Sequence, residues 1–375
     1  MKKYRIATIV GTRPELIRLS LLIQKLDNNF DHYLIHTGQN YDYELNEIFF
    51  QDLNIKKPDH YLNANTETLG DALGSIIEKS YKILNEVKPD AVLVLGDTNS
   101  SLSILPAKRL KIPIFHMEAG NRCFDFNVPE EINRKVADTL SDINLCYTEN
   151  SRRYLLAEGH RGDRLYVTGS PMYEVLKFHK SGIEQSSILE KLDLKKSEYF
   201  VVSLHREENV DSKDSLCAFI NAIELIGEKY DKEIIFSTHP RTRDRINKFN
   251  IEHSNRIKLL KPLGFFDYVN LQKNALCVLS DSGTISEESK ILNFKAISLR
   301  NSTERPEALE AGSIILGGKT PSTILNALEI TLNRMDRDQQ TRPNEYFISN
   351  TSDIVLGIIQ SWIEGINRLT WQKKY

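Results

Sequence analysis

The sequence predicts an α/β fold built from two parallel-sheet domains. Short apolar runs of the kind that form buried strands alternate with segments of helical periodicity almost throughout the chain. This alternation restarts after a polar, charged stretch at residues 192–198. The length of 375 residues exceeds what one hydrophobic core usually supports, and a prior of roughly 150 residues per domain gives two domains.

The expected strands form two series, one for each domain. The first series comprises residues 5–10, 32–36, 91–95, 112–116, 143–147 and 165–168, and the second comprises residues 199–204, 233–237, 257–260, 275–280, 295–299 and 313–316. A turn-forming cluster at residues 169–171 sets the boundary, which gives an N-terminal domain of residues 1–170 and a C-terminal domain of residues 171–351. The amphipathic stretch at residues 352–375 is expected to form a helix that packs back on the first domain.

The composition excludes several classes of function. With 49 Lys and Arg against 51 Asp and Glu, the net charge of −2 indicates neither a nucleic-acid footprint nor a polybasic membrane surface. Apolar runs such as residues 91–95 are far shorter than the roughly 20 residues of a membrane-spanning helix. Met1 leads straight into a strand without a signal-peptide pattern, so we expect a soluble, cytoplasmic protein. The four cysteines lack a paired metal-ligand spacing, so we expect reduced thiols and no metal site.

Two strand-to-helix junctions, one in each half of the chain, have the features of anion sites. They are residues 10–15 and residues 280–288. In each, an apolar strand leads into a segment with a glycine, Gly11 or Gly283, which allows a tight turn. An amphipathic helix follows, and the first N–H groups of a helix have no partner within it. Both junctions are therefore suited to hold an anion, as a cleft for a nucleotide-activated substrate requires.

Polar residues follow many of the expected strands. In open α/β sheets, ligands bind at the carboxyl ends of the strands. The segments at these ends are Gly11-Thr12-Arg13, Gly38-Gln39, Gly96-Asp97-Thr98, His116-Met117-Glu118, His205-Arg206-Glu207, His239-Pro240-Arg241 and Asp281-Ser282-Gly283. Each segment alone could be an ordinary cap or turn, but together they predict a site.

The residues at the two junctions suit a nucleotide. Arg13 can form a charge-assisted pair with a phosphate, although a surface salt bridge to Glu15 is the alternative. Ser282 and Gly283 offer a hydroxyl and an unobstructed backbone to a pyrophosphate, and the Glu288 carboxylate suits ribose hydroxyls. Ordinary helix capping would explain the serine but not the glycine that follows it.

Acidic residues and a histidine are candidates for acid and base chemistry. Asp97 and Glu118 come at strand ends, and Glu130 and Glu131 follow Pro129 at a helix start. Burial or a neighbouring like charge would raise a carboxylate pKa enough to make it a base near neutral pH. Glu131 is expected merely to complement the helix dipole. His205 ends an apolar strand, and a purely structural histidine is the alternative there.

Together these segments resemble the non-hydrolysing UDP-N-acetylglucosamine 2-epimerase family over nearly the whole chain. The motifs that carry the resemblance are Gly11-Thr12-Arg13-Pro14-Glu15, Thr37-Gly38-Gln39, Gly96-Asp97-Thr98, His116-Met117-Glu118-Ala119-Gly120, Pro129-Glu130-Glu131-Ile132-Asn133-Arg134, His205-Arg206-Glu207, Asp281-Ser282-Gly283 and Thr303-Glu304-Arg305-Pro306-Glu307. The resemblance implies a GT-B-like pair of Rossmann-like domains with the active site in the interdomain cleft, a homodimer, and neither cofactor nor metal.

The resemblance also implies a reaction and a set of site residues. UDP is eliminated across carbons 1 and 2 of a UDP-sugar and added back after the intermediate is reprotonated on its other face. The catalytic group would be Asp97, Glu118, Glu130 and His205. The substrate contacts would be Arg13, Arg18, Arg134, Tyr268, Ser282, Gly283 and Glu288, with Tyr268 beside uracil.

Departures from the family pattern bear on the substrate. Arg18 replaces the usual lysine, Asn40 replaces a histidine, and Thr284 replaces a second glycine. Residues 116–125 resemble the sub-branch that makes UDP-N-acetyl-L-fucosamine from UDP-2-acetamido-2,6-dideoxy-L-talose for surface polysaccharide such as capsule or O-antigen. Epimerisation of UDP-N-acetylglucosamine to UDP-N-acetylmannosamine is the second candidate. A GT-B glycosyltransferase, a hydrolysing epimerase and a non-catalytic UDP-sugar binding protein are further alternatives.

Overall fold

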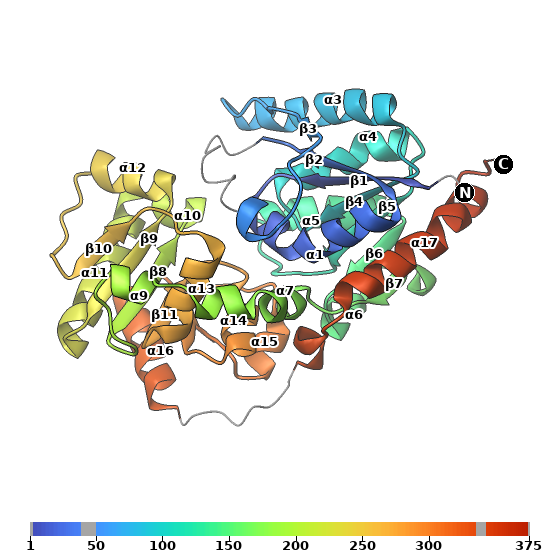
Figure 1. Cartoon of the computed structure of the whole chain (residues 1–375). Coiled ribbons are helices and arrows are strands. Elements are labelled where there is room, and N and C mark those ends of the chain that lie inside the picture. Colours follow the sequence, from blue (N-terminus) through green and yellow to red (C-terminus); the bar gives the residue numbers. More distant parts are fainter. Residues whose placement is uncertain (1–2, 39–49, 335–342, 374–375) are drawn as a thin grey trace. The chain divides into compact units, whose positions relative to one another are not determined.

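The computed structural model describes residues 3–38, 50–334 and 343–373. The chain divides into two compact units. The first unit consists of residues Met1–Phe178 and Asn344–Tyr375, and the second consists of residues His179–Pro343. Each unit is built around one parallel sheet with helices on both of its faces (Figure 1).

The sheet of the first unit has seven strands in the order β3-β2-β1-β4-β5-β6-β7, and all neighbours are parallel. The strands are β1 (Arg5–Val10), β2 (Asp31–His36), β3 (His60–Tyr61), β4 (Ala91–Leu95), β5 (Ile114–Ala119), β6 (Ile143–Cys146) and β7 (Leu165–Val167). The strand order reverses between β1 and β4, which lie side by side. Such a reversal creates the crevice in which α/β sheets bind ligands.

Helices cover the first sheet. They are α1 (Arg13–Asn29), α3 (Leu69–Val87), α4 (Ile104–Arg109), α5 (Pro129–Leu140), α6 (Glu149–Ala157), α7 (Met172–Phe178) and α17 (Thr351–Leu369), with short 3-10 turns η1 (Asn99–Ser103), η2 (Gly162–Arg164) and η3 (Asn344–Phe347). The C-terminal helix α17 packs beside α1 (Figure 1). The indole N–H of Trp362 in α17 donates to the hydroxyl of Tyr166 in β7 at 2.7 Å, which ties this helix to the sheet edge.

The second unit repeats the same architecture with six strands in the order β10-β9-β8-β11-β12-β13. The strands are β8 (Tyr199–Leu204), β9 (Glu233–Thr238), β10 (Ile257–Leu260), β11 (Cys277–Ser280), β12 (Ala296–Ser298) and β13 (Ile315–Leu316). The helices are α8 (Lys180–Glu184), α9 (Ile188–Lys191), α10 (Glu207–Val210), α11 (Lys213–Tyr230), α12 (Pro240–Lys248), α13 (Phe265–Asn274), α14 (Ile285–Leu292), α15 (Pro306–Glu310) and α16 (Pro321–Asn333). Here the order reverses between β8 and β11.

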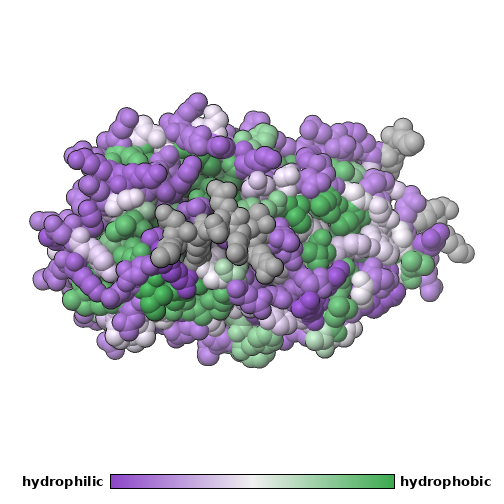
Figure 2. Space-filling model, turned by 90° about the horizontal axis from the view of Figure 1, so that it is seen from below, coloured by the Kyte–Doolittle hydropathy of each residue, from purple (hydrophilic) through white to green (hydrophobic). Residues whose placement is uncertain are grey.

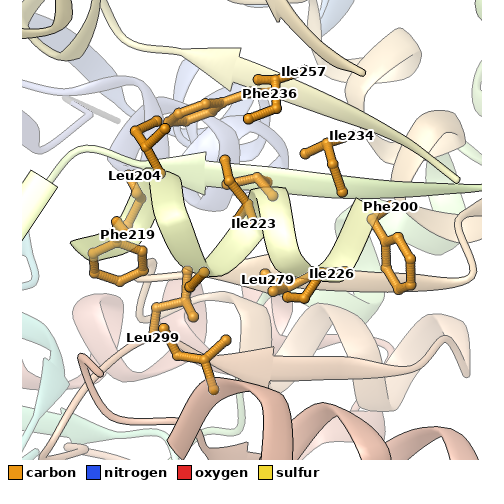
Figure 3. Close-up of a cluster of buried hydrophobic side chains, with 14 of the residues drawn as sticks. Phe200, Leu204, Phe219, Ile223, Ile226, Ile234, Phe236, Ile257, Leu279 and Leu299 are labelled. Atoms are coloured by element: carbon orange, nitrogen blue, oxygen red, sulfur yellow. The ribbon is translucent and has the colours of Figure 1, made fainter. Parts of the chain in front are cut away.

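The core of the second unit shows why its strands are continuous apolar runs. Phe200 and Leu204 of β8 face one side of the sheet, where they pack with Ile223 of α11 in the cluster drawn in Figure 3. Tyr199 and Val201 face the opposite side, in a separate buried cluster. Because helices cover both faces, successive residues of a strand are all buried, and the sequence shows no polar alternation.

These observations confirm the predicted fold class of two parallel α/β domains. Two details differ. The strand β3 was not predicted, because its two residues follow no apolar run. The strand β5 continues to Ala119, beyond the predicted end at residue 116, so that Glu118 lies within the strand.

The surface agrees with the balanced composition. Hydrophilic residues cover most of the face that Figure 2 shows, with smaller hydrophobic patches between them. In the described part of the chain, no helix combines the length and the apolar character that crossing a membrane would require.

Candidate functional site

Candidate residues of the first unit gather where the strand order of its sheet reverses. The segment Gly11–Arg13 follows β1, and Asp97 follows the neighbouring strand β4. Glu118 lies near the end of β5, which pairs with the other edge of β4. The parallel strands therefore bring these segments to one edge of the sheet, as the sequence predicted.

The first junction is closed by the carboxylate of Glu15, which the sequence argument considered only as the partner of Arg13 in an alternative surface salt bridge. Glu15 is buried, with 2% of its surface exposed, and its Oε2 accepts the Gly11 N–H at 2.6 Å. One of the amides that we expected to bind an anion therefore has an internal partner. Arg13 is the first residue of α1 and is half-buried, and Pro14 occupies the first helical turn.

Glu118 has an unusual backbone conformation. Its φ angle is +66°, in the left-handed region that costs a non-glycine residue of order 1–3 kcal/mol. The pairing of β5 with β6 shifts register between Met117 and Ala119, so that Glu118 is the extra residue of a bulge. Bulges re-aim side chains, and this one turns the Glu118 carboxylate toward Arg18 of α1.

Arg18 and Glu118 form an ion pair in which both side chains are 7% exposed. Glu118 Oε1 also accepts from the Asn121 side chain at 3.3 Å. The sequence argument assigned Arg18 to the substrate; in the structure it holds a candidate catalytic carboxylate and lies 5.9 Å from the ring centre of Tyr147.

Gly96 makes room for this carboxylate. Its φ angle is +76°, and a Cβ at this position would lie 3.2 Å from Glu118 Oε2. Its carbonyl oxygen lies 2.8 Å from Nε2 of the buried His116. The turn that precedes Asp97 is thus held by the hydrogen bond with His116 and packs against the Glu118 carboxylate.

Asp97 is held by an arginine of helix α5. Its Oδ2 accepts from Arg134 Nε at 2.7 Å, and Arg134 Nη1 also donates to Glu131 Oε2 at 2.8 Å. The Asn133 side chain donates to the Asp97 carbonyl at 2.9 Å. Arg134, which we expected to contact substrate, therefore bridges two carboxylates.

The structure corrects the expectation for Glu131. We expected Glu131 to complement the helix dipole, but it is fully buried and accepts the backbone N–H groups of Cys123 at 3.0 Å and Phe124 at 3.3 Å. It therefore anchors the loop that precedes α5. Glu130 is half-buried in the first turn of α5.

A buried network that the sequence argument missed supports the strand that carries Glu118. His116 Nδ1 lies 2.9 Å from Asp138 Oδ1, and Asp138 Oδ2 accepts from Arg122 Nη1 at 2.7 Å. Arg122 also forms a bidentate ion pair with Glu158, through Nε to Oε1 and Nη2 to Oε2. Burial alone would lower the pKa of His116, but its hydrogen bond to Asp138 and the charge of that carboxylate raise this pKa. Burial alone would raise the pKa of Asp138, but His116 and Arg122 lower it.

In the second unit, candidate residues again lie at the reversal point of the sheet. Asp281 follows β11 and is fully buried, and its Oδ1 lies 2.9 Å from His205 Nδ1 at the end of β8. Its Oδ2 accepts from the backbone N–H of Arg206 at 3.0 Å and from the Asn209 side chain at 3.0 Å. Although burial acts in the opposite direction, the nearby His205 and these hydrogen bonds lower the pKa of Asp281. His205, with 44% of its side chain exposed, is therefore oriented by a buried carboxylate.

The junction before α14 also has internal partners. The Ser282 N–H donates to Ser280 Oγ at 3.1 Å, and the Thr284 N–H donates to Ser282 Oγ at 3.3 Å. A Cβ at Gly283 would lie 2.5 Å from Glu304 Oε1, so any larger residue here would displace the Glu304 carboxylate from its present position. An anion at this junction would share these amides with the serine hydroxyls.

The charged segment that follows β12 packs against this junction. Arg300 and Glu304 form a buried ion pair at 2.7 Å, and Arg305 donates to the Gly283 carbonyl at 3.1 Å and pairs with the buried Glu287. The sequence motif at residues 303–307 therefore includes two side chains, Glu304 and Arg305, that build the junction.

The two residues expected near the nucleoside lie on adjacent helices. Glu288 of α14 accepts from the Gln272 side chain at 3.0 Å. Tyr268 of α13 is half-buried and packs against the apolar cluster that contains Tyr199 and Val201. Burial, followed by the negative charge of Glu288, raises the pKa of Tyr268.

The structure thus divides the predicted site residues between the units. The first unit contains Arg13, Arg18, Asp97, Glu118, Glu130 and Arg134, and the second contains His205, Tyr268, Ser282, Gly283 and Glu288. Gln39 and Asn40 of the sequence motifs lie outside the described residues. Among the residues that the structure describes, no group of three His, Cys, Asp or Glu side chains converges as a metal ion would require, and all four cysteines are free thiols.

The first unit can therefore present two carboxylates to a substrate, Asp97 and Glu118, each held by a buried arginine. A carboxylate that a cation holds in place can accept a proton from a substrate that binds beside it. The second unit can present an oriented imidazole and the half-buried hydroxyl and backbone groups of residues 282–284 before α14. These are the groups needed for proton transfer beside a bound anion.

Comparison with known proteins agrees with this chemistry. The sequence profile described as "UDP-N-acetylglucosamine 2-epimerase" matches residues 24–360. A UDP-N-acetylglucosamine 2-epimerase of Methanococcus maripaludis is 37% identical over 365 residues, which cover 95% of this chain and 98% of the relative.

Solved structures give the same result for the fold. The UDP-N-acetylglucosamine 2-epimerase of Rickettsia bellii is 45% identical, with a TM-score of 0.92 and coverage of 99% of this chain and 100% of the other. A second structure, from Methanocaldococcus jannaschii, contains UDP-GlcNAc and UDP; it is 37% identical, with a TM-score of 0.90 and coverage of 95% and 99%.

Proposed function

Because the chain belongs to the UDP-N-acetylglucosamine 2-epimerase family, we propose that it is an isomerase that inverts carbon 2 of a UDP-N-acetyl-hexosamine without net hydrolysis. The observation that carries this proposal is the pair of carboxylates at the reversal point of the first sheet. Asp97 is held by Arg134, and Glu118 is held by Arg18. Inversion of carbon 2 requires one group that removes a proton from one face and another that delivers a proton to the opposite face, and two separately held carboxylates could supply them.

The reaction explains why several charged groups are needed. A base removes the proton from carbon 2, the electron pair of that C–H bond forms a double bond to carbon 1, and the bond from carbon 1 to oxygen breaks as UDP leaves. Return of a proton to the other face of carbon 2 and re-addition of UDP give the epimer. Because the proton on carbon 2 is weakly acidic by itself, its removal must be coupled to the departure of a stabilised diphosphate.

Residues of both units contribute to this chemistry in our proposal. Asp97, Glu118 and Glu130 handle the proton at carbon 2. Arg13 and the helix start at Ser282 and Gly283 bind the diphosphate, together with the oriented imidazole of His205. Glu288 binds the ribose and Tyr268 lies beside uracil. The roles of Arg18 and Arg134 are to hold the carboxylates in place, beside any contact that they make with substrate.

UDP-N-acetylglucosamine is the substrate with the better support, because the similar proteins from Methanococcus maripaludis and Rickettsia bellii carry that name. The L-talose derivative, which would yield UDP-N-acetyl-L-fucosamine and was the first expectation from the sequence, becomes the second candidate. In its favour, Arg18 replaces the lysine that the family usually has, and residues 116–125 resemble that sub-branch. The buried network around Arg122 shows that this loop has a defined conformation.

Incubation of the purified protein with each UDP-sugar separately, without any acceptor, tests the function. Proton NMR should show a second UDP-sugar that differs only at carbon 2, with the UDP linkage retained. Release of UDP with free sugar would indicate a hydrolysing enzyme, and an unchanged substrate with measurable binding would indicate a sensor. Turnover only when an acceptor is added would indicate a glycosyltransferase. Turnover of the L-talose derivative alone would reverse our choice of substrate.

We also propose that the protein is a homodimer, as the family resemblance implies. Sedimentation equilibrium of the purified chain measures the mass directly. A mass of about twice the 43.1 kDa of one chain would support the proposal, and a monomer mass at micromolar concentration would exclude it.

A further inference from the structure

Glu15 is a buried carboxylate that the proposed mechanism does not use. Its Oε1 accepts from Thr98 Oγ1 at 2.5 Å, its Oε2 accepts from the Gly11 N–H at 2.6 Å, and Ser100 Oγ lies 3.1 and 3.2 Å from the two oxygens. These donors come from two different loops. One loop follows β1, and the other follows the adjacent strand β4.

The second of these loops contains Asp97. Thr98 directly follows Asp97 and begins the 3-10 turn η1, where its hydroxyl oxygen also accepts from the Ser100 N–H at 3.3 Å. Asp97 is therefore restrained on two sides. Arg134 holds its carboxylate, and Glu15 holds the backbone that follows it through Thr98.

We infer that Glu15 is a positioning residue for the proposed epimerisation, which holds Asp97 in its reactive orientation through the hydroxyl of Thr98. This inference rests on the proposed function, because Asp97 is assigned to proton transfer there. The carboxylate links the ends of β1 and β4 on either side of the point where a ligand would bind. A displacement of about 1 Å in a reacting group can lower a rate by about 100-fold.

The placement of Glu15 is costly for stability alone. Burial raises the pKa of Glu15 to about 7 despite the hydrogen bonds from Thr98, Gly11 and Ser100. A side chain that only filled this space could be apolar, with no charge to desolvate. The cost supports a role in positioning rather than in packing.

Two substitutions separate these roles. Leucine at position 15 has a similar volume and accepts no hydrogen bond, so E15L releases both loops. Glutamine can accept from the Gly11 N–H and donate to the Thr98 hydroxyl, so E15Q keeps the link. T98V removes the same link from the other side. The matched control is E174L, because Glu174 is a buried carboxylate in the same unit that binds Ser352 in α17, away from the site.

Steady-state epimerisation should show a fall in kcat of about 10- to 100-fold for E15L and T98V with KM unchanged within twofold. E15Q should stay within about threefold of wild type. The double variant E15L/T98V should be no slower than the slower single variant, because both substitutions break one link. E174L should lose stability and keep kcat. A kcat for both E15L and T98V equal to that of wild type would overturn the inference.

Hydrogen exchange gives a readout that does not depend on the proposed function. Amides at residues 96–103 should exchange about 5- to 10-fold faster in E15L and T98V than in wild type, and those of the second unit should not change. Unchanged exchange in this loop would overturn the inference even in an active enzyme. If the wild type is inactive on every UDP-sugar, the proposed function fails, while the exchange data still decide whether Glu15 restrains the Asp97 loop. If E15L does not fold, T98V alone provides both readouts.

Discussion

Arg18 and Glu118 are 100 positions apart in the chain, yet they form a buried ion pair beside the reversal point of the first sheet. The free energy needed to remove two charges from water offsets much of the gain from their mutual attraction, so such a pair adds little net stability. Loss of one partner is different, because the other charge then stays buried without compensation. The pair therefore fixes the orientation of Glu118 more than it stabilises the fold.

We predict that R18M destabilises the protein by about 3–5 kcal/mol, the usual cost of leaving a buried charge without its partner. Urea denaturation at constant pH measures the change in free energy of unfolding. The control K82M breaks the exposed pair of Lys82 with Glu78, whose side chains are 67% and 63% exposed, and should cost less than about 1 kcal/mol. Equal effects of the two substitutions would contradict the importance of the buried pair.

G96A should reduce activity by more than its effect on stability explains. Alanine at φ +76° is strained by about 1–2 kcal/mol, and its Cβ would press on Glu118 Oε2 at 3.2 Å. Gly159 provides a matched control, because its φ angle is +88° and nothing lies within 4 Å of a Cβ there. G159A should lower the melting temperature by a similar amount and keep kcat, whereas G96A should lower both. Full activity of G96A would show that the carboxylate tolerates displacement.

D138N should lower the pKa of His116. Asp138 is the main cause of the raised pKa of His116, and without its charge the effect of burial prevails, so the midpoint should fall below the ordinary value of about 6.5. NMR of the imidazole nitrogens during a pH titration measures this midpoint. E158Q serves as the control, because Glu158 pairs with Arg122 and leaves the contact of Asp138 with His116 intact. A midpoint that does not change in D138N would exclude Asp138 as the cause.

The pKa of Glu15 predicts how stability depends on pH. A carboxyl whose pKa is raised from 4.5 to about 7 by folding adds stability at low pH that is lost as pH rises through the folded pKa. The groups that contact it are the Gly11 amide and the side chains of Thr12, Thr98 and Ser100, none of which is charged.

Wild type should therefore lose about 2–3 kcal/mol relative to E15Q between pH 5 and pH 8. Urea denaturation of the two proteins at several pH values gives this difference directly, and other titrating groups cancel in the comparison. A constant difference across this range would show that Glu15 titrates near its ordinary pKa.

Much of the fold follows from local sequence. Strands such as β1 and β8 are buried on both faces, so that their apolar runs identify them without knowledge of the rest of the molecule. Their carboxyl ends, and hence the segments at Gly11, Asp97 and Asp281, follow from the strands. The strand β3 and the last residues of β5 escaped prediction because pairing with neighbouring strands defines them, rather than a local apolar pattern.

Partner choice in the site could not be predicted in the same way. Nothing near Glu118 in the sequence indicates its positive φ angle or its pairing with Arg18. The contact of Asp281 with His205 joins residues that directly follow two adjacent strands and are 76 positions apart in the chain. The burial of Glu15 and Glu131 also depends on loops that only the folded chain brings over them. The place of each glutamate in the first turn of a helix is the local signal that they share.

Label at carbon 2 tests the central claim most directly. Wild type and E118Q are incubated with UDP-N-acetylglucosamine in heavy water, and deuterium at carbon 2 is followed by NMR while UDP binding is measured by calorimetry. We predict that wild type incorporates one deuterium at carbon 2 of the epimeric product, and that E118Q binds UDP but incorporates label at least about 100-fold more slowly. Epimerisation without label, or labelling by E118Q at the wild-type rate, would contradict the account.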